Sequence, residues 1–99
     1  MLNIEKAKNG DELKLALAGR LDTTTAPQLE AEMKENLDGI ESLILDFENL
    51  EYISSAGLRV LLSAQKIMNK QGCMVVKNSS EEIKEIFEVT GFSDILTIE

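Results

Sequence analysis

The changes of apolar period along the chain constrain its fold more than any other feature. Leu13, Leu15 and Leu17 alternate with other positions, which is the pattern of a strand with one wetter face. From Ala26 onward the apolar residues recur at spacings of three and four, which places them on one helix face. Such segments follow one another in the order β-β-α-β-α-β-α-β. This order predicts a single α/β domain, residues 1–99, in which a small mixed sheet of four to five strands packs with helices.

Five segments are predicted to be strands: residues 2–7, 12–19, 42–47, 73–77 and 94–99. The first two form a hairpin, and the nearly continuous apolar runs of the next two are typical of strands covered on both faces. Cys73, in the fourth segment, is therefore expected to be a small buried hydrophobe. The methionines Met33, Met68 and Met74 are expected in the core.

Three segments are predicted to hold the helices: residues 20–39, 56–72 and 79–91. The second is apolar on most sides, so we expect it to be central in the fold. Two capping boxes are expected at helix starts, formed by Thr25 with Gln28 and by Ser79 with Glu82. Pro27 fits the first turn of its helix, and Gly39 and Gly91 are the expected stops.

Composition excludes several classes of function. The chain carries 18 acidic and 10 basic residues, a net charge of −8, which argues against binding to nucleic acid or anionic membrane surfaces. The same charge suits either a basic partner protein or solubility alone. With no histidine and one cysteine, no disulfide within the chain and no serine–histidine or cysteine–histidine mechanism can be built. No apolar run approaches the ~20 residues of a membrane span, and the N-terminus does not resemble a signal peptide, so a cytoplasmic location is expected.

Two loops are expected at the carboxyl ends of strands, where sites collect in open α/β sheets. One contains Gly19-Arg20-Leu21-Asp22 and three threonines, and the other runs over residues 48–57. If the strands are adjacent, Asp22 and Thr23 lie near Ser54 and Ser55. The ordinary alternative for Asp22 is a turn or cap residue, and Asp46 and Glu48 are expected to be solvated carboxylates. The acidic residues show no metal-ligand spacing, and no cofactor is implied.

Ser55 has two interpretations on physical grounds. It precedes Ala56, Gly57 and an apolar helix, so its hydroxyl could simply accept a backbone N–H as the N-cap. Alternatively it could be phosphorylated. A phosphate there would meet unpaired N–H groups and the positive end of the helix dipole, and Gly57 would let the backbone come close.

Two motifs on this element order resemble the STAS domain, the family of bacterial anti-sigma factor antagonists. They are Gly19-Arg20-Leu21-Asp22 and Ser55-Ala56-Gly57-Leu58, and the similarity runs over about residues 3–98. The resemblance implies a protein that binds an anti-sigma factor serine kinase and so releases a sigma factor. It also implies that the kinase phosphorylates a serine at the start of the second helix, which ends binding, and that a phosphatase resets the switch.

The family's positions carry over to individual residues of this chain. The phosphoacceptor falls on Ser55, with Asp22 as an acidic neighbour and Gly57 and Leu58 as the helix-start pair; Thr23 and Ala56 complete the surroundings. Antagonists commonly have an aspartate immediately before the acceptor, and this chain has Ser54 there. That departure makes Ser54 the alternative acceptor.

Other roles remain open at this level. STAS domains also serve as constitutive subunits of scaffolds and lipid-transport complexes, or as tails of anion transporters. The lack of a membrane span and the start at Met1 lead us to expect a whole protein rather than a transporter tail. An enzyme is not expected, because Asp22 and two serines are the only candidate groups and no suitable base accompanies them.

Overall fold

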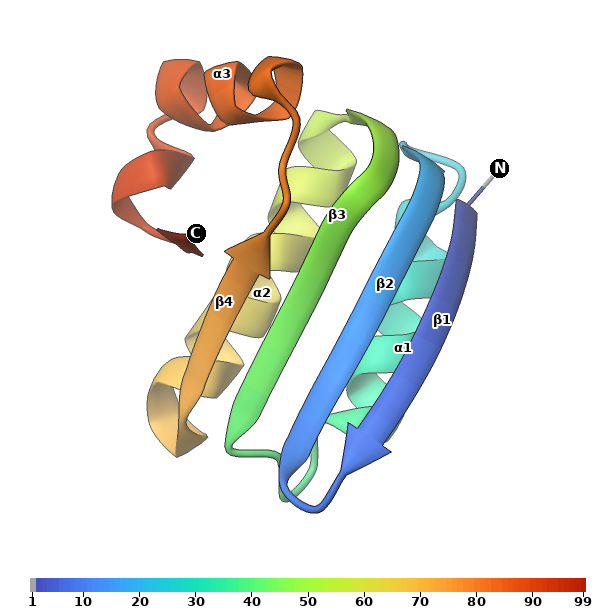
Figure 1. Ribbon diagram of the computed structural model, residues 1–99, viewed down its shortest axis with the longest axis vertical. Coiled ribbons are helices and arrows are strands. Elements are labelled where there is room, and N and C mark those ends of the chain that lie inside the picture. The colour runs from blue at the N-terminus through green and yellow to red at the C-terminus, as the bar shows by residue number, and fades with distance from the viewer. Residues whose placement is uncertain (1) are drawn as a thin grey trace.

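Five strands form one sheet in the computed structural model, which describes residues 2–99 (Figure 1). The strands lie side by side in chain order: β1 (Leu2–Asn9), β2 (Glu12–Leu21), β3 (Ser42–Ile53), β4 (Cys73–Lys77) and β5 (Thr97–Ile98). β1 and β2 are an antiparallel hairpin, and every later pair is parallel. The predicted mixed sheet and order of elements are confirmed.

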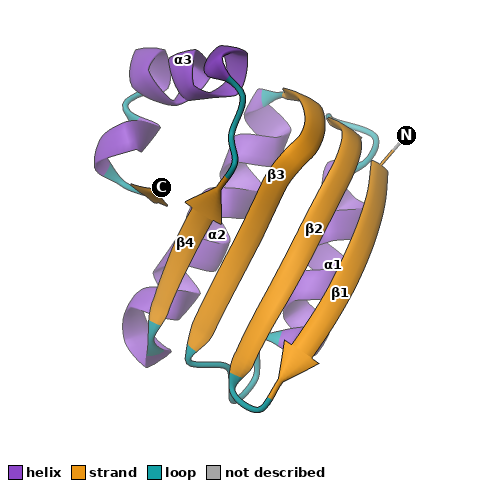
Figure 2. Cartoon of the chain, viewed as in Figure 1, coloured by secondary structure: helices purple, strands orange, loops and turns teal. Residues whose placement is uncertain are grey.

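Two helices cover one face of the sheet. α1 (Ala26–Asn36) lies behind β1 and β2, and α2 (Ser55–Gln71) lies behind β3 and β4 (Figure 2). α3 (Glu81–Thr90) and the short 3-10 helix η1 (Phe92–Asp94) lie beyond the carboxyl end of β4. The prediction that the central strands are covered on both faces is therefore wrong.

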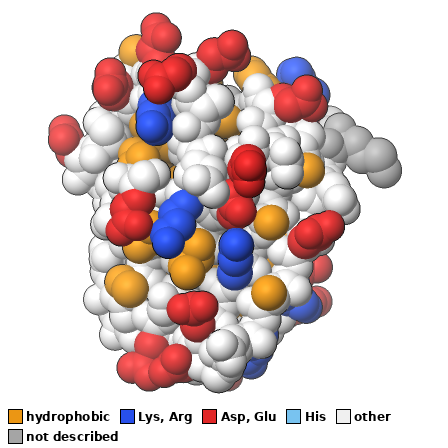
Figure 3. Space-filling model, viewed as in Figure 1, with side chains coloured by type: hydrophobic (Ala, Val, Ile, Leu, Met, Phe, Trp, Pro, Cys, Tyr) orange, Lys and Arg blue, Asp and Glu red, His pale blue; other side chains and the backbone are white. Residues whose placement is uncertain are grey.

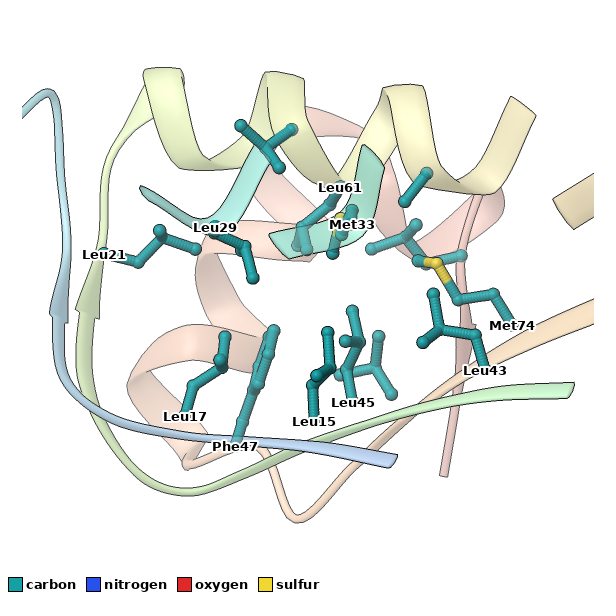
Figure 4. Close-up of a cluster of buried hydrophobic side chains, with 14 of the residues drawn as sticks. Leu15, Leu17, Leu21, Leu29, Met33, Leu43, Leu45, Phe47, Leu61 and Met74 are labelled. Atoms are coloured by element: carbon teal, nitrogen blue, oxygen red, sulfur yellow. The ribbon is translucent and has the colours of Figure 1, made fainter. Parts of the chain in front are cut away.

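The core fills the space between the sheet and the two covering helices. Leu15 and Leu17 of β2 and Phe47 of β3 point toward Leu29 of α1 and Leu61 of α2, and all five are at most 1% exposed (Figure 4). The predicted core positions of the three methionines are also confirmed; Met33, Met68 and Met74 are buried. The apolar residues that alternate along the strands and those that repeat along the helices therefore form one common core.

The opposite face of the sheet is open to solvent. Figure 3 views this face and shows basic, acidic and apolar side chains interspersed on it. Cys73, the first residue of β4, is exposed. The next residue, Met74, is buried in the core, so Cys73 lies on the opposite, open face of the sheet, beside Ser42 of β3. The prediction that Cys73 is buried is wrong, since strand alternation continues through the apolar run.

Helix ends follow the sequence only in part. Gly91 ends α3 in the left-handed conformation, as predicted. Ser80, not Ser79, caps the start of α3 and accepts a hydrogen bond from the Ile83 N–H. Thr25 makes no side-chain cap, so the capping box predicted with Gln28 is wrong; Pro27 does occupy the first turn.

The first helix also ends earlier than expected. α1 stops at Asn36 with Leu37 as its C-cap, and Gly39 lies in the following turn at a φ of +79°. The chain therefore leaves the helix before the glycine, and Gly39 serves the turn that leads to β3.

β3 extends to Ile53, beyond the predicted end at residue 47. Irregularities in its pairing with β2 interrupt the alternation of buried and exposed side chains, so the second half of the strand lacks a strand-like pattern in the sequence. The register shifts between Ala16 and Ala18 and again between Gly19 and Arg20, so exposed residues such as Glu48 and Glu51 sit within the strand.

Asp46 stands beside the first irregularity. Its Oδ1 accepts hydrogen bonds from the Glu48 N–H at 3.0 Å and from Asn78 Nδ2 at 3.1 Å, and Lys14 Nζ lies 3.7 Å from Oδ2. The expectation that Asp46 is a solvated strand-end carboxylate is wrong.

Replacing Asp46 by asparagine is expected to lower the free energy of unfolding near pH 7 by about 1 kcal/mol. The Glu48 N–H, then Asn78 and Lys14, hold the pKa of the Asp46 carboxyl below its ordinary value of 3.8. Because the pKa is depressed in the folded state, this stabilisation is present above about pH 4 and is lost as pH falls through the lowered pKa.

Urea unfolding of Asp46→Asn and wild type from pH 7 to pH 2 measures this contribution. The difference between the two proteins should shrink below pH 4. Glu48→Gln, which removes an exposed carboxylate two positions away, is the control and should behave like wild type. A difference between Asp46→Asn and wild type that is the same at pH 7 and pH 2 would contradict this assignment.

Candidate functional site

The loops that follow β2 and β3 leave the sheet side by side, as the sequence predicts. Leu21 pairs with Ile53 in parallel register, and the Ser54 N–H donates to the Leu21 carbonyl oxygen at 2.9 Å. Asp22 and Ser54 are therefore the next residues of two adjacent strand ends. Figure 1 shows both loops at the same edge of the sheet.

Asp22 organises the turn between β2 and α1. Its Oδ1 accepts hydrogen bonds from the Thr24 N–H at 3.0 Å, the Thr24 hydroxyl at 2.7 Å and the Thr25 N–H at 3.2 Å. These donors, the Thr24 hydroxyl foremost, hold the pKa of the carboxyl below its usual value. Asp22 is thus a stably charged turn residue at the edge that carries Ser54.

The threonines of this loop differ in their surroundings. Thr25 is buried; its hydroxyl donates to the Arg20 carbonyl oxygen at 2.9 Å and accepts from the Asp22 N–H at 2.8 Å. Thr23 is exposed. The hydroxyl of Thr25 therefore closes the turn instead of capping the helix.

Ser54, not Ser55, is the N-cap of α2. Its backbone is extended, with a φ of −99° and a ψ of 175°, and its Oγ accepts the Gly57 N–H at 3.4 Å. Ser55 is the first helical residue; it is exposed, and its hydroxyl makes no hydrogen bond to another group within residues 2–99. The interpretation of Ser55 as the capping side chain is wrong by one position.

Gly57 has a packing role that sequence reasoning missed. A Cβ atom at this position would lie 2.7 Å from Leu21 Cγ and 3.0 Å from Ile53 Cγ1. A glycine thus lets the start of α2 press against the ends of β2 and β3. Leu58 is buried, and Ala56 is half-buried against the core. Ser55 stands at the outer side of this closely packed turn.

Arg20 and Tyr52 extend the site and are not among the residues proposed from sequence. They pair in register across β2 and β3, and the Arg20 guanidinium carbon lies 4.3 Å from the centroid of the Tyr52 ring. Arg20 Nε also lies 3.9 Å from Asp22 Oδ2. Sequence reasoning missed the pair because it placed Arg20 and Tyr52 in loops, although both are strand residues.

Residues 3–99 match the STAS domain family. The chain belongs to this family. This STAS domain is 40% identical over 84 residues to the protein BtrV of Bordetella bronchiseptica, a match that covers 83% of this chain and 72% of BtrV. It is 28% identical over 98 residues to the anti-sigma-B factor antagonist of Bacillus subtilis, covering 98% of this chain and 90% of that protein.

A solved structure shares the fold of this STAS domain. It is the Bacillus cell fate determinant SpoIIAA in its phosphorylated form, which superposes with a TM-score of 0.75 at 19% sequence identity. The match covers 100% of this chain and 91% of that one. At this identity the likeness concerns the fold alone.

The STAS domain offers neither a metal centre nor a membrane-spanning helix in the part of the chain that the structure describes. No three acidic or cysteine side chains among residues 2–99 gather as metal ligands would. None of the helices in that range combines the length and the apolar character needed to cross a membrane. The chemical groups described at this edge of the sheet are the exposed Ser55 hydroxyl, the charged Asp22 carboxylate, and the Arg20 guanidinium stacked on Tyr52.

Proposed function

We propose that this STAS domain is an anti-sigma factor antagonist whose binding is switched by phosphorylation of Ser55. The observation that carries the proposal is the position of Ser55: it is exposed, and it is the first residue of α2. The unmodified domain binds an anti-sigma factor that is also a serine kinase, and a sigma factor is released. Phosphorylation ends this binding, and a phosphatase restores it.

The start of α2 can hold a phosphate without refolding. The first backbone N–H groups of a helix lack intrahelical partners, and the helix dipole favours negative charge there. In the proposed reaction, Ser55 Oγ forms a bond to the γ-phosphorus of ATP as the bond to the leaving ADP oxygen breaks. A base of the kinase takes the hydroxyl proton. The STAS domain is the substrate in this step; it supplies the Ser55 hydroxyl and needs no cofactor of its own.

Ser54 is the less suitable of the two adjacent serines. It is half-buried, and its hydroxyl already accepts the Gly57 N–H. A kinase acting on Ser54 would have to draw a half-buried hydroxyl out of this cap, which is worth about 1 kcal/mol to the helix start. Ser55 can be modified without breaking any side-chain hydrogen bond among the described residues.

Incubation with the cognate kinase and ATP, followed by mass spectrometry, tests the acceptor. We expect one phosphate per chain, located on Ser55. Ser55→Ala should abolish incorporation, and Ser54→Ala should retain it, although loss of the cap will lower its stability by about 1 kcal/mol. Unchanged incorporation into Ser55→Ala would contradict the assignment. Stable partner binding without incorporation into either serine would favour a constitutive STAS subunit of a scaffold or lipid-transport complex.

A further inference from the structure

Two arginines near the start of α2 differ in the contacts that they already make. Arg20 lies against the Tyr52 ring and beside the Asp22 carboxylate. Arg59 is exposed on α2, and it takes part in no ion pair within residues 2–99. Arg59 is thus the cation at this helix start that has no acidic partner in the described part of the chain.

Arg59 stands one helical turn after Ser55. Residues four positions apart lie on the same face of a helix, and side chains lean toward the helix N-terminus. The spacing therefore places Arg59 and the exposed Ser55 on the same face of α2, one turn apart. A guanidinium matches the oxygens of a phosphate and can donate two parallel hydrogen bonds to it.

We propose that Arg59 binds the phosphate of phosphorylated Ser55 within the same chain. This inference rests on the proposed function, because it concerns the modified form of that serine. It assigns Arg59 as the positioning residue that fixes the phosphate against α2. Phosphorylation then changes two residues of the surface together: Ser55 gains a dianion, and Arg59 is no longer available to a partner.

The other charged groups at this edge are consistent with that pairing. Asp22, from the turn after β2, would repel a phosphate, but Arg20 lies against its carboxylate. Glu51, near the end of β3, is exposed to solvent, which screens its charge. Arg59 is the nearest cation along α2 itself, since the next ones are Lys66 and Lys70.

The test uses phosphoserine placed at position 55 during translation, so no kinase is needed. Titration of the phosphate by ³¹P NMR between pH 4 and pH 8 gives its second pKa. A bound guanidinium favours the dianion and lowers this pKa, so Arg59→Gln should raise it by about 0.3 pH unit or more. Lys66→Gln removes the same charge from an exposed position two turns farther along α2 and should leave it unchanged. Arg59→Lys keeps the positive charge, so its phosphate pKa should lie between those of wild type and Arg59→Gln.

An unchanged phosphate pKa in Arg59→Gln would overturn the inference, as would equal shifts in Arg59→Gln and Lys66→Gln. A shift seen with Arg20→Gln but not with Arg59→Gln would assign the phosphate to Arg20 and overturn it as well. A kinase that ignores Ser55 would contradict the proposed function but would not affect this titration. The two failures are therefore distinguishable.

Discussion

Replacing Gly72 by alanine is expected to lower the free energy of unfolding by about 3 kcal/mol or more. Gly72 follows the last residue of α2, and its N–H donates to the Met68 carbonyl oxygen at 2.6 Å. A methyl group on it would overlap the backbone carbonyl of Glu41. The same carbonyl accepts the Cys73 N–H at 3.0 Å, so relief of the overlap would disturb the start of β4.

The surroundings leave little room for this overlap to relax. The Gln71 side chain donates to the Leu37 and Ile40 carbonyl oxygens, each at 2.6 Å, which ties the end of α2 to the segment before β3. A loss of about 3 kcal/mol is a large part of the about 5–15 kcal/mol that stabilises a typical domain. Thermal or urea unfolding of Gly72→Ala measures the loss directly.

Gly91→Ala separates steric overlap from backbone strain. Gly91 has a φ of +82°, but a Cβ there would meet no atom within 4 Å. Its replacement should cost only about 1 kcal/mol, from the left-handed conformation alone. Gly72 has a φ of 172°, which any residue adopts, so its larger cost must come from the overlap. If Gly72→Ala were as mild as Gly91→Ala, the close approach of Gly72 to Glu41 would be wrong.

The sequence predicted the fold well where one period governs a whole element. Leu13, Leu15 and Leu17 alternate and are all buried, and the methionines at helical spacing are in the core. The crossover rule then placed β2 beside β3, and with them the two loops of the site. Local pattern and chain order were sufficient for these features.

The prediction of the strands failed in two situations. In β3 the alternation of buried and exposed residues is interrupted, and in β4 an apolar run does not show whether helices cover one face of the sheet or both. The second half of β3 was predicted to be a loop, because the shifted register leaves Glu48 and Glu51 exposed without regular alternation. Cys73 lies in an apolar run, and only the placement of both covering helices on one face of the sheet leaves it exposed. Both features depend on tertiary arrangement.

The site shows the same division. The sequence located the serine pair at a helix start, but cap geometry decides that Ser54 is the cap and leaves Ser55 outside it. The contact of Arg20 with Tyr52 depends on a register between residues 32 positions apart, which no local pattern contains. The exact roles of adjacent residues therefore came from backbone conformation and strand pairing.

Phosphorylation of Ser55 is expected to weaken binding to the anti-sigma factor kinase about 100-fold. In the proposed complex the start of α2 faces the partner, and a phosphate adds a charge of about −1.5 to −2 to that surface. Unfavourable charge and desolvation at an interface cost several kcal/mol, and about 3 kcal/mol corresponds to a 100-fold change. α2 already begins at Ser55 in the unmodified protein, so the fold itself should not change.

Isothermal titration of the kinase with three forms of the protein tests whether phosphorylation of Ser55 controls partner binding. The forms are the unmodified protein, the protein with phosphoserine at position 55, and a control with phosphoserine at position 63, which is exposed two turns farther along α2. We expect tight binding of the unmodified form, about 100-fold weaker binding when Ser55 is modified and a much smaller change when Ser63 is modified. Equal affinity of the unmodified and Ser55-phosphorylated forms, or equal losses at the two positions, would contradict this control by Ser55.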